Sequence, residues 1–495
     1  MASSSATDTA LAWFRRDLRV LDNPALHAAV RSGHKLVCVF IHETGGETAT
    51  APGAASRWWL HHSLERLAED LSARGARLVL RSGDPAEILP ALAREASCGE
   101  IYWNRADRPE FDARDRRLAR QLERSGIRPR TFRGSTLIDP ASHLNGSDKP
   151  YRVFTPFWKA ALRTLDPRAP LPAPTQLING KEVASEVLED WSLLPSRPNW
   201  ASGFDRDWTP GEAGAHAKLD AFLCGPMAAY PTDRDRPDRE GTSRLSPHFA
   251  WGEISPRTVW HRARDHAERG GAFQPMEKFL SEVGWRDFAI YLAFHFGDLR
   301  EANFNSQFDH FPWRKNNDGL EAWKRGQTGV PIVDAAMRQL WQTGWMHNRT
   351  RMIVASYLIK HLGVHWRDGM VWFEDTLVDA DLNVNAASWQ WVAGSGADAA
   401  PYFRVFNPVS QGVKFDPNGV YVRRWVPELA QLDSKAIHAP WDQPDGILAM
   451  AGVTLGKTYP RPVVDLKQGR ESALAAYQRM KECASSAAAE ADATS

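Results

Sequence analysis

The segment from Trp345 to Gln411 brings together side chains that can do chemistry with flat and with charged ligands. It contains the runs WMHNRTRM at 345–352, DAD at 379–381 and WQW at 389–391. A purely structural helix would be rich in leucine and alanine instead. Aromatic rings stack on flat ligands, and arginine can hold a phosphate through two parallel hydrogen bonds. These residue types predict a site for a planar cofactor beside a site for nucleic-acid bases.

A run of small polar residues upstream has the composition of a phosphate-binding loop. After Gly241 come Thr242, Ser243, Arg244, Leu245 and Ser246, and Tyr230 precedes the run. Hydroxyl and guanidinium groups donate hydrogen bonds to phosphate oxygens, and a helix N-terminus adds backbone donors. Serine and threonine before a helix also serve as plain N-caps, so the run alone leaves both interpretations open.

A carboxyl group and an indole lie three residues apart in the run FLSEVGWR at 279–286. On a helix, Glu282 and Trp285 share one face. The carboxyl group could then bond to the edge of a base while the ring stacks on it. The plain alternative is a surface glutamate and a core tryptophan, and the spacing alone favours that alternative.

Taken together, these runs resemble the flavin- and lesion-binding region of the DNA photolyase and cryptochrome family. The resemblance extends from the run WFRRDLR at 13–19 to about Pro440, and its specific part is the C-terminal half. It implies FAD as the cofactor, with Arg351 paired to Asp379. The residues that it assigns to FAD binding are Tyr230, Thr242, Ser243, Arg244, Leu245, Ser246, Phe279, Arg286, Asn348, Arg351, Asp379, Ala380, Asp381 and Asn385.

The resemblance also implies a DNA partner that contains pyrimidine dimers. The residues assigned to the lesion and its DNA are Glu282, Trp285, Asn348, Arg349, Met352, Trp391 and Gln411. The implied activity is light-driven repair of cyclobutane pyrimidine dimers, in which reduced FAD passes an electron to a dimer flipped out of the duplex. Glu282 takes the catalytic role of a hydrogen-bond donor to the dimer, while Trp285 and Trp391 stack on it.

Three further tryptophans, Trp389, Trp366 and Trp313, occupy the family's electron-transfer positions. We expect them to carry an electron from the surface to photoexcited oxidised FAD, with Trp389 nearest the flavin. Asn385 matches the residue that faces flavin N5 in the family. Without the resemblance, Asn385 is interpreted as a helix N-cap.

Other functions within the family remain as alternatives. A photolyase for the (6-4) photoproduct would carry paired histidines, whereas here His347 is followed by Asn348, and we interpret His347 as a satisfied core histidine. A cryptochrome-type blue-light photoreceptor without repair activity is disfavoured by Asn385. Bacterial class I and class III types both fit. We expect a second, antenna chromophore, and the sequence leaves open a methenyltetrahydrofolate, in a pocket near Glu43, or a deazaflavin.

Composition limits the partners. The chain has 495 residues, of which 43% are hydrophobic and 24% charged, as expected for a folded protein of two or more domains. The formal net charge is +1, so DNA binding needs a local basic groove. The four cysteines are scattered without metal-ligand spacing, and we expect no metal and a cytoplasmic protein, nucleoid-associated when bound to DNA. We expect no membrane contact, no obligate protein partner and a monomer.

The first 135 residues alternate short β-rich runs with amphipathic helical runs. The expected strands are 11–14, 36–41, 77–81, 100–103 and 129–132, and the expected helices are 24–31, 56–74, 85–96 and 110–124. Such alternation predicts an α/β domain with a parallel, Rossmann-like sheet and helices on both faces. No G-x-G-x-x-G run follows the first strand, so a dinucleotide-binding fingerprint is absent.

The domain boundaries follow from these changes of pattern. Residues 1–135 form the α/β antenna-type domain, and 136–215 form a long interdomain connector with one helix at 154–164. An all-α domain at 216–483 binds FAD and the DNA lesion. Residues 484–495 are expected to be a disordered tail.

Overall fold

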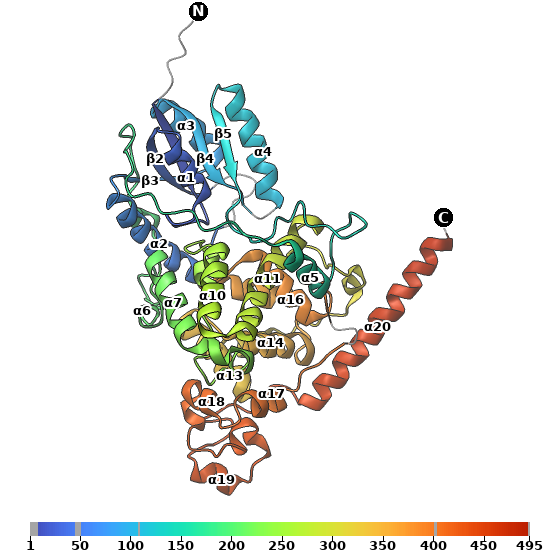
Figure 1. Cartoon of the computed structure of the whole chain (residues 1–495). Coiled ribbons are helices and arrows are strands. Elements are labelled where there is room, and N and C mark those ends of the chain that lie inside the picture. Colours follow the sequence, from blue (N-terminus) through green and yellow to red (C-terminus); the bar gives the residue numbers. More distant parts are fainter. Residues whose placement is uncertain (1–7, 45–50, 107–108, 400–402, 494–495) are drawn as a thin grey trace, which may run out of the picture.

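The computed structural model describes residues 8–44, 51–106, 109–399 and 403–493. An α/β domain forms one end of the molecule and a helical domain forms the other, with the connector running beside both (Figure 1). Among the described residues, no helix is both long enough and apolar enough to cross a membrane.

Five parallel strands form one sheet in the order β3-β2-β1-β4-β5. The strands are β1 (Thr9–Phe14), β2 (Lys35–His42), β3 (Leu78–Ser82), β4 (Cys98–Asn104) and β5 (Arg128–Phe132). All five lie where the sequence predicts them. Because successive side chains of a strand point to opposite faces, Ala10, Ala12 and Phe14 enter one apolar core, and Leu11 and Trp13 enter another.

Helices cover both faces of this sheet, as predicted. Helices α1 (Pro24–Arg31) and α2 (Ala54–Ser72) share the core on one face, and α3 (Pro85–Glu95) covers the other face together with α4 (Pro109–Arg124). The strand order reverses direction between β1 and β4. In open α/β sheets the carboxyl ends of the strands at such a point border a crevice that binds ligands.

The connector is an ordered part of the fold. Its helices are α5 (Phe154–Thr164), η1 (Leu188–Trp191) and α6 (Phe204–Asp207). The N–H of Leu36 donates to the carbonyl oxygen of Ile178 at 2.7 Å, and the N–H of Gly180 donates to the carbonyl of Leu36 at 2.8 Å. These bonds tie the connector to strand β2, and α5 matches the predicted helix.

The remainder of the chain is helical, as predicted, around one large apolar core. Its elements are α7 (Glu212–Cys224), η2 (Pro226–Ala229), α8 (Tyr230–Asp233), α9 (Ser246–Ala250), α10 (Pro256–Gly270), α11 (Phe273–Phe296), η3 (Ser306–His310), α12 (Asn317–Lys324), α13 (Pro331–Thr343), α14 (Asn348–Ser356), η4 (Tyr357–His361), α15 (Trp366–Thr376), α16 (Leu382–Ala393), α17 (Pro408–Phe415), α18 (Val420–Trp425), η5 (Pro427–Leu429), η6 (Ala436–His438), η7 (Pro440–Asp442), α19 (Asp445–Met450) and α20 (Leu466–Ala493).

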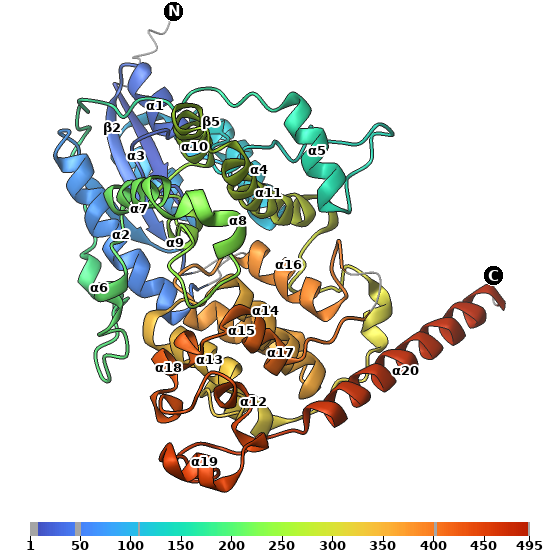
Figure 2. The ribbon, with the colours of Figure 1, turned by 60° about the horizontal axis from the view of Figure 1, so that its bottom comes forward.

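Helix α20 differs from the sequence-based expectation. It continues to Ala493 through most of the segment that was expected to be a disordered tail, and its end projects from the body of the molecule (Figure 2). The segment is rich in alanine, which has the highest helix propensity of all residues. The expectation weighed low hydrophobicity and neglected that propensity.

Candidate functional site

Helix α11 carries one wall of the predicted lesion site. Phe279, Glu282 and Trp285 follow at intervals of three residues, so they lie along one side of the helix. Phe279 is buried and meets the ring of Tyr230 edge-on at 5.7 Å. Trp285 stacks on Phe154 of α5, with ring centroids 3.9 Å apart and planes 15° apart. The sequence analysis missed Phe154, which covers one face of this indole and leaves only the other face for a ligand.

A row of alternating charges begins at Glu282. This charge row consists of Glu282, Arg234, Asp235 and Arg349, in that order. The carboxylate of Glu282 accepts a hydrogen bond from Nη1 of Arg234 and lies 3.4 Å from Nζ of Lys278. Asp235 lies 3.8 Å from Nε of Arg234 and 2.9 Å from Nη2 of Arg349. The sequence analysis selected Glu282 and Arg349 separately and missed Arg234 and Asp235, which connect them.

The N-terminus of α14 presents the predicted lesion-binding run. His347 is its N-cap, and Nδ1 accepts a hydrogen bond from the N–H of Arg349 at 3.2 Å. Burial lowers the pKa of His347 to about 3, so the ring is neutral at pH 7. It is a buried histidine, as expected, but its Nε2 has no hydrogen-bond partner among the described residues. Asn348 is exposed, Met352 is half-buried, and the Arg349 guanidinium lies 4.4 Å from the centre of the Phe415 ring.

Arg351 and Asp379 form the predicted ion pair, with Nη2 and Oδ2 2.7 Å apart. Nε of Arg351 also donates to the carbonyl oxygen of Met346 at 2.7 Å. The other carboxylate oxygen of Asp379 is buried and has no hydrogen-bond partner in the described part of the chain. Such an oxygen costs free energy until a ligand donates to it. Ala380, next in the chain, is buried.

The predicted phosphate-binding run lies beside Trp345. The guanidinium of Arg244 lies between two indoles, 4.8 Å from the centre of Trp208 and 4.7 Å from that of Trp345. Ser246 Oγ accepts a hydrogen bond from Nε1 of Trp345 at 3.2 Å. Nε of Arg244 is buried without a hydrogen-bond partner among the residues that the structure describes. An unused donor therefore lies in this run.

The other members of the run have different surroundings. Thr242 and Ser243 are half-buried, whereas Leu245 is buried. Helix α9, which follows, has only five residues, so the hydroxyl groups and Arg244 are the main donors here rather than a long helix. An unused guanidinium donor and the unused acceptor of Asp379 suit a nucleotide cofactor with phosphates and an N–H-bearing ring, as FAD has.

Helix α16 begins after Asp381, which is its N-cap. The Asp381 carboxylate accepts hydrogen bonds from the N–H groups of Asn383 and Val384 at 3.0 and 3.1 Å. Asn385 lies inside the helix and donates from Nδ2 to the carbonyl oxygen of Met370 at 3.1 Å. Its interpretation as an N-cap is therefore wrong, because the cap lies one turn earlier.

The three predicted electron-transfer tryptophans follow α15 from the core towards the surface. The buried ring of Trp389 lies against the backbone of this helix at Gly369, where an added Cβ would come within 2.1 Å of the indole. Trp366, one turn away on the same helix, is fully buried. Trp313 is partly exposed and lies 4.7 Å from His365, whose ring is 5.6 Å from Trp366.

A second group of indoles lies beside the first. The sequence marks Trp341 and Trp345 as candidates for an alternative electron route, whereas Trp323 and Trp372 were not selected. Trp323 lies 6.2 Å from Trp389 in an edge-on arrangement. Near it on the surface, Trp341 stacks on Trp372 with centroids 6.1 Å apart and planes 6° apart. In a chain with 21 tryptophans, no local signal distinguishes these from ordinary packing.

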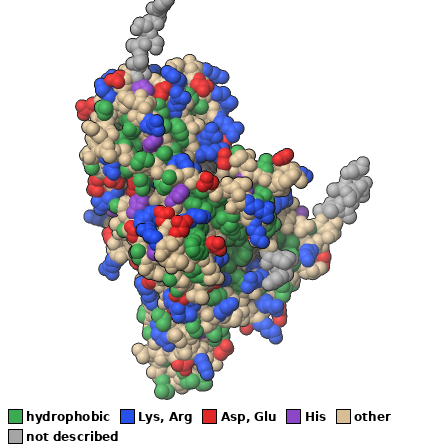
Figure 3. Space-filling model, in the orientation of Figure 1, with side chains coloured by type: hydrophobic (Ala, Val, Ile, Leu, Met, Phe, Trp, Pro, Cys, Tyr) green, Lys and Arg blue, Asp and Glu red, His purple; other side chains and the backbone are tan. Residues whose placement is uncertain are grey.

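The remaining predicted DNA-binding residues lie on α16 and α17. Trp391 is half-buried and donates from Nε1 to the carbonyl oxygen of Asp398 at 3.0 Å. Gln411 is half-buried on α17. Residues 400–402, which belong to the chemically dense segment, lie outside the described residues. The space-filling view has an apolar recess on the helical domain, with Lys and Arg side chains around it (Figure 3).

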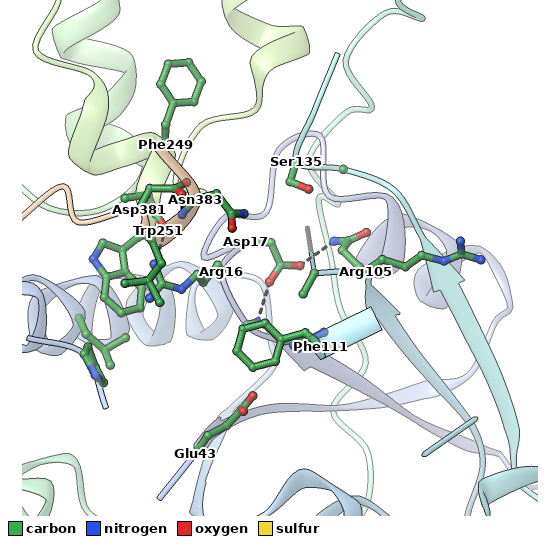
Figure 4. A pocket seen from close by; sticks show the side chains of 18 of the residues that line it. Arg16, Asp17, Glu43, Arg105, Phe111, Ser135, Phe249, Trp251, Asp381 and Asn383 are labelled. Atoms are coloured by element: carbon green, nitrogen blue, oxygen red, sulfur yellow. Dashed lines mark hydrogen bonds between the residues drawn. The ribbon is translucent and has the colours of Figure 1, made fainter. Parts of the chain in front are cut away.

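A separate pocket lies between the two domains, at the carboxyl ends of the strands (Figure 4). Asp17, just after β1, accepts hydrogen bonds from the N–H of Arg15 and from Nδ2 of Asn104, both at 2.6 Å. The helical domain contributes Trp251 and Asp381 to the lining. The position agrees with the crevice that the strand order creates between β1 and β4.

Two further predicted residues line this interdomain pocket beside Asp381. Glu43 pairs with Arg114, with the two charged atoms 2.6 Å apart. Arg286, expected at the flavin, donates from Nη1 to the carbonyl oxygen of Ser135 at 2.7 Å and lines the same pocket. Arg286 therefore connects α11, the helix that carries Trp285, to the interdomain pocket.

A cluster of possible metal ligands occurs on α2. His61, His62 and Glu65 place ligand-type atoms within 4.8 Å of one another. Glu65 lies 3.5 Å from Nε2 of His61 and 2.8 Å from Nδ1 of His62, so its carboxylate already has two partners. The sequence analysis did not select this cluster.

Comparison with known proteins gives two family matches. The model described as "DNA photolyase" matches residues 10–175, and the model described as "FAD binding domain of DNA photolyase" matches residues 279–479. The deoxyribodipyrimidine photo-lyase of Agrobacterium fabrum is 50% identical over 479 residues, which cover 97% of this chain and 99% of that protein. Cryptochrome-1 of Arabidopsis thaliana is 38% identical over 495 residues, covering 97% of this chain and 72% of that protein.

The fold is also similar to solved structures. The crystal structure of a bacterial class III photolyase from Agrobacterium tumefaciens matches with a TM-score of 0.94 and 50% identity, over 97% of this chain and 99% of the other. A cryptochrome of Synechocystis matches with a TM-score of 0.85 and 32% identity, over 94% of this chain and 98% of the other.

Proposed function

Because the chain belongs to the DNA photolyase and cryptochrome family, we propose that it is a lyase that uses light to repair cyclobutane pyrimidine dimers in DNA. The identity to a photo-lyase, 50%, exceeds the 38% identity to cryptochrome-1, which favours repair over light sensing. The observation that carries the proposal is the single charge row that joins Glu282, beside Trp285, to Arg349.

The family's helical domain binds FAD, and bound FAD supplies the light absorption and the electron for repair. In this chain Arg244 donates to its phosphates, helped by the hydroxyl groups of Thr242 and Ser243. The unpartnered oxygen of Asp379 accepts from the ring system or the ribose, while Arg351 holds that carboxylate in place. These assignments use the polar atoms that the protein leaves unsatisfied.

The DNA-facing residues have separate tasks. A dimer flipped out of the duplex stacks on the free face of Trp285 and on Trp391, since base–aromatic stacking contributes about 1–3 kcal/mol per base. Glu282 bonds to the dimer and orients it. Arg349 holds a DNA phosphate with a charge-assisted hydrogen bond. The two carbon–carbon bonds that join the pyrimidines break and the transferred electron returns, so only light is consumed.

The interdomain pocket suits the second chromophore. We assign it there because the ring of Trp251 and the carboxylates of Asp17 and Glu43, just after β1 and β2, line the pocket (Figure 4). A folate and a deazaflavin both meet that description. Extraction of the purified protein followed by mass spectrometry distinguishes them. The similarity to the Agrobacterium structure further favours the class III type, and we propose a cytoplasmic monomer.

The proposed function is tested by repair in light and darkness. Reduced holoprotein is mixed with a duplex that carries one cyclobutane dimer, and dimer loss is measured by chromatography. We expect loss only under blue light, and a much weaker reaction for Trp285→Ala, which removes a stacking face. Trp341→Ala is the matched control, because that indole is 52% exposed and stacks on Trp372 rather than at the lesion site. Equal repair in light and in darkness would overturn the proposal, and so would equal repair by Trp285→Ala and Trp341→Ala.

A further inference from the structure

The charge row offers two alternative sets of partners. Arg234 lies between Glu282 and Asp235, and Asp235 lies between Arg234 and Arg349. In the structure Arg234 is bound to Glu282, and Arg349 is bound to Asp235 at 2.9 Å. The middle contact, between Arg234 Nε and Asp235 at 3.8 Å, is the loosest of the three. The row can therefore exchange partners by shortening this one contact.

The two ends of the row lie on different helices. Glu282 follows the face of α11 that carries Trp285, whereas Arg349 lies at the start of α14 over the ring of Phe415. The Glu282 side chain is 28% exposed, so a ligand can reach it, whereas the Asp235 oxygen that faces both arginines is buried. A ligand at either end competes with a carboxylate that is already in place.

We propose that Asp235 makes the grip of Arg349 on DNA depend on a dimer in the lesion pocket. This inference rests on the proposed repair function. When a dimer enters, Glu282 bonds to it and releases Arg234. Arg234 then turns to Asp235, and Arg349 becomes free to hold a phosphate. With undamaged DNA, Glu282 keeps Arg234, and Asp235 stays on Arg349 as a carboxylate in the place of the phosphate.

The other arginines of the same loop are outside this exchange. Arg236 pairs with Asp238 at 2.5 Å, and Arg239 pairs with Asp233 at 2.7 Å. Each therefore has its own carboxylate partner within six residues of it in the chain. Asp233 supplies a matched control, because it lies two residues from Asp235 and pairs with a different arginine.

Binding in the dark to undamaged and dimer-containing duplexes tests the proposal. For Asp235→Asn we expect affinity for undamaged DNA to rise roughly twofold to fivefold, because the phosphate no longer competes with a partly exposed ion pair. The slope of log affinity against log salt concentration should steepen by about 0.9, because one more phosphate contact forms. Affinity for dimer-containing DNA should change less, because Arg349 is already released when a dimer is bound. The preference of the variant for dimer-containing over undamaged DNA should therefore fall. Asp233→Asn should prefer dimer-containing DNA over undamaged DNA as strongly as the wild type does.

A change at the far end of the row gives a second, non-local test. Glu282→Gln weakens the hold on Arg234, so Asp235 can exchange partners without a dimer. We expect affinity for undamaged DNA to rise although Glu282 does not contact Arg349. In the double variant with Asp235→Asn this gain should disappear, because both changes act through one exchange.

The outcomes separate this inference from the repair function. If the wild type fails to prefer dimer-containing DNA, the proposed function is wrong. If the wild type discriminates but Asp235→Asn discriminates equally well, with wild-type thermal stability and FAD content, the partner exchange is wrong. Additive effects of Glu282→Gln and Asp235→Asn would also overturn it.

Discussion

The helical-domain site and the interdomain pocket are built in different ways. The first takes its side chains from α11, α14 and α16, where intervals of three or four residues fix what lies on one face. The second takes them from strand ends of one domain and from loops of the other (Figure 4). The first is also held by internal ion pairs such as Arg351–Asp379. We therefore expect single substitutions to disable the helical-domain site, whereas the interdomain pocket should be separable from repair.

The largest effect is expected for Asp379→Ala. It leaves the Arg351 guanidinium without its partner in a largely buried position, and breaking a buried ion pair costs about 3 kcal/mol. The free energy of unfolding should fall by about that amount, and FAD should be lost. Urea unfolding and flavin absorption measure both. Asp368→Ala, an exposed position on α15, is the control, and retention of FAD at wild-type stability would contradict the assignment of Asp379.

Arg349→Ala should weaken binding of dimer-containing DNA by roughly 1–3 kcal/mol, the range for a hydrogen bond to a charged group. The salt slope should become shallower by about 0.9, since one phosphate contact is lost. Fluorescence anisotropy over a series of salt concentrations measures both. An unchanged slope would show that Arg349 does not hold a phosphate.

Acid should destabilise the helical domain through its buried histidines. Burial lowers the pKa of His347 to about 3 and those of His361 and His365 to about 4, so below pH 6.5 the unfolded chain binds protons that the folded chain excludes. Burial raises the pKa of Asp334 and Asp416 to about 6, which acts in the opposite direction between about pH 4 and 6. For these five groups alone, the three histidines outweigh the two aspartates, and the net loss of stability is roughly 1.4 kcal/mol per pH unit near pH 5. Denaturant unfolding followed by helical circular dichroism should show this fall, and stability that rises between pH 6 and 5 would be inconsistent with it.

Trp366→Phe should lower stability by roughly 1–3 kcal/mol, because the smaller ring leaves a cavity at a fully buried position and Asn303 loses the indole N–H. It removes an oxidisable indole from the middle of the path along α15. Pre-reduced variant should repair dimers normally, whereas photoreduction of oxidised FAD should become slow, as followed by flavin absorption. Photoreduction at the wild-type rate would direct attention to Trp323, which contacts Trp389 at 6.2 Å.

The smallest effect on repair is expected for Trp251→Ala in the interdomain pocket. Dimer binding and FAD content should stay at wild-type values, while the second chromophore should be depleted. Repair should then lose efficiency only at wavelengths that this chromophore absorbs, as an action spectrum measures. Loss of FAD together with the second chromophore would show that the two regions are not separable.

The sequence predicted the elements of the fold because its local patterns agree with its tertiary structure. Strand–helix alternation gave the sheet, and the i, i+3 relation of Glu282 and Trp285 needed only one helix. Phe154, Arg234 and Asp235 could not be predicted in the same way, because their roles arise from contacts between segments far apart in sequence. Asn385 was misinterpreted without the family resemblance, since Asp381 one turn earlier is an equally good cap.

The most direct test of the account compares two lesions under one light source. Pre-reduced holoprotein is illuminated with duplexes that carry either a cyclobutane dimer or a (6-4) photoproduct, and lesion loss is measured in light and darkness. The account predicts that cyclobutane dimers are restored in light alone and that (6-4) photoproducts remain, because His347 is neutral and is followed by Asn348 rather than a second histidine. Restoration of (6-4) photoproducts without restoration of dimers would contradict it.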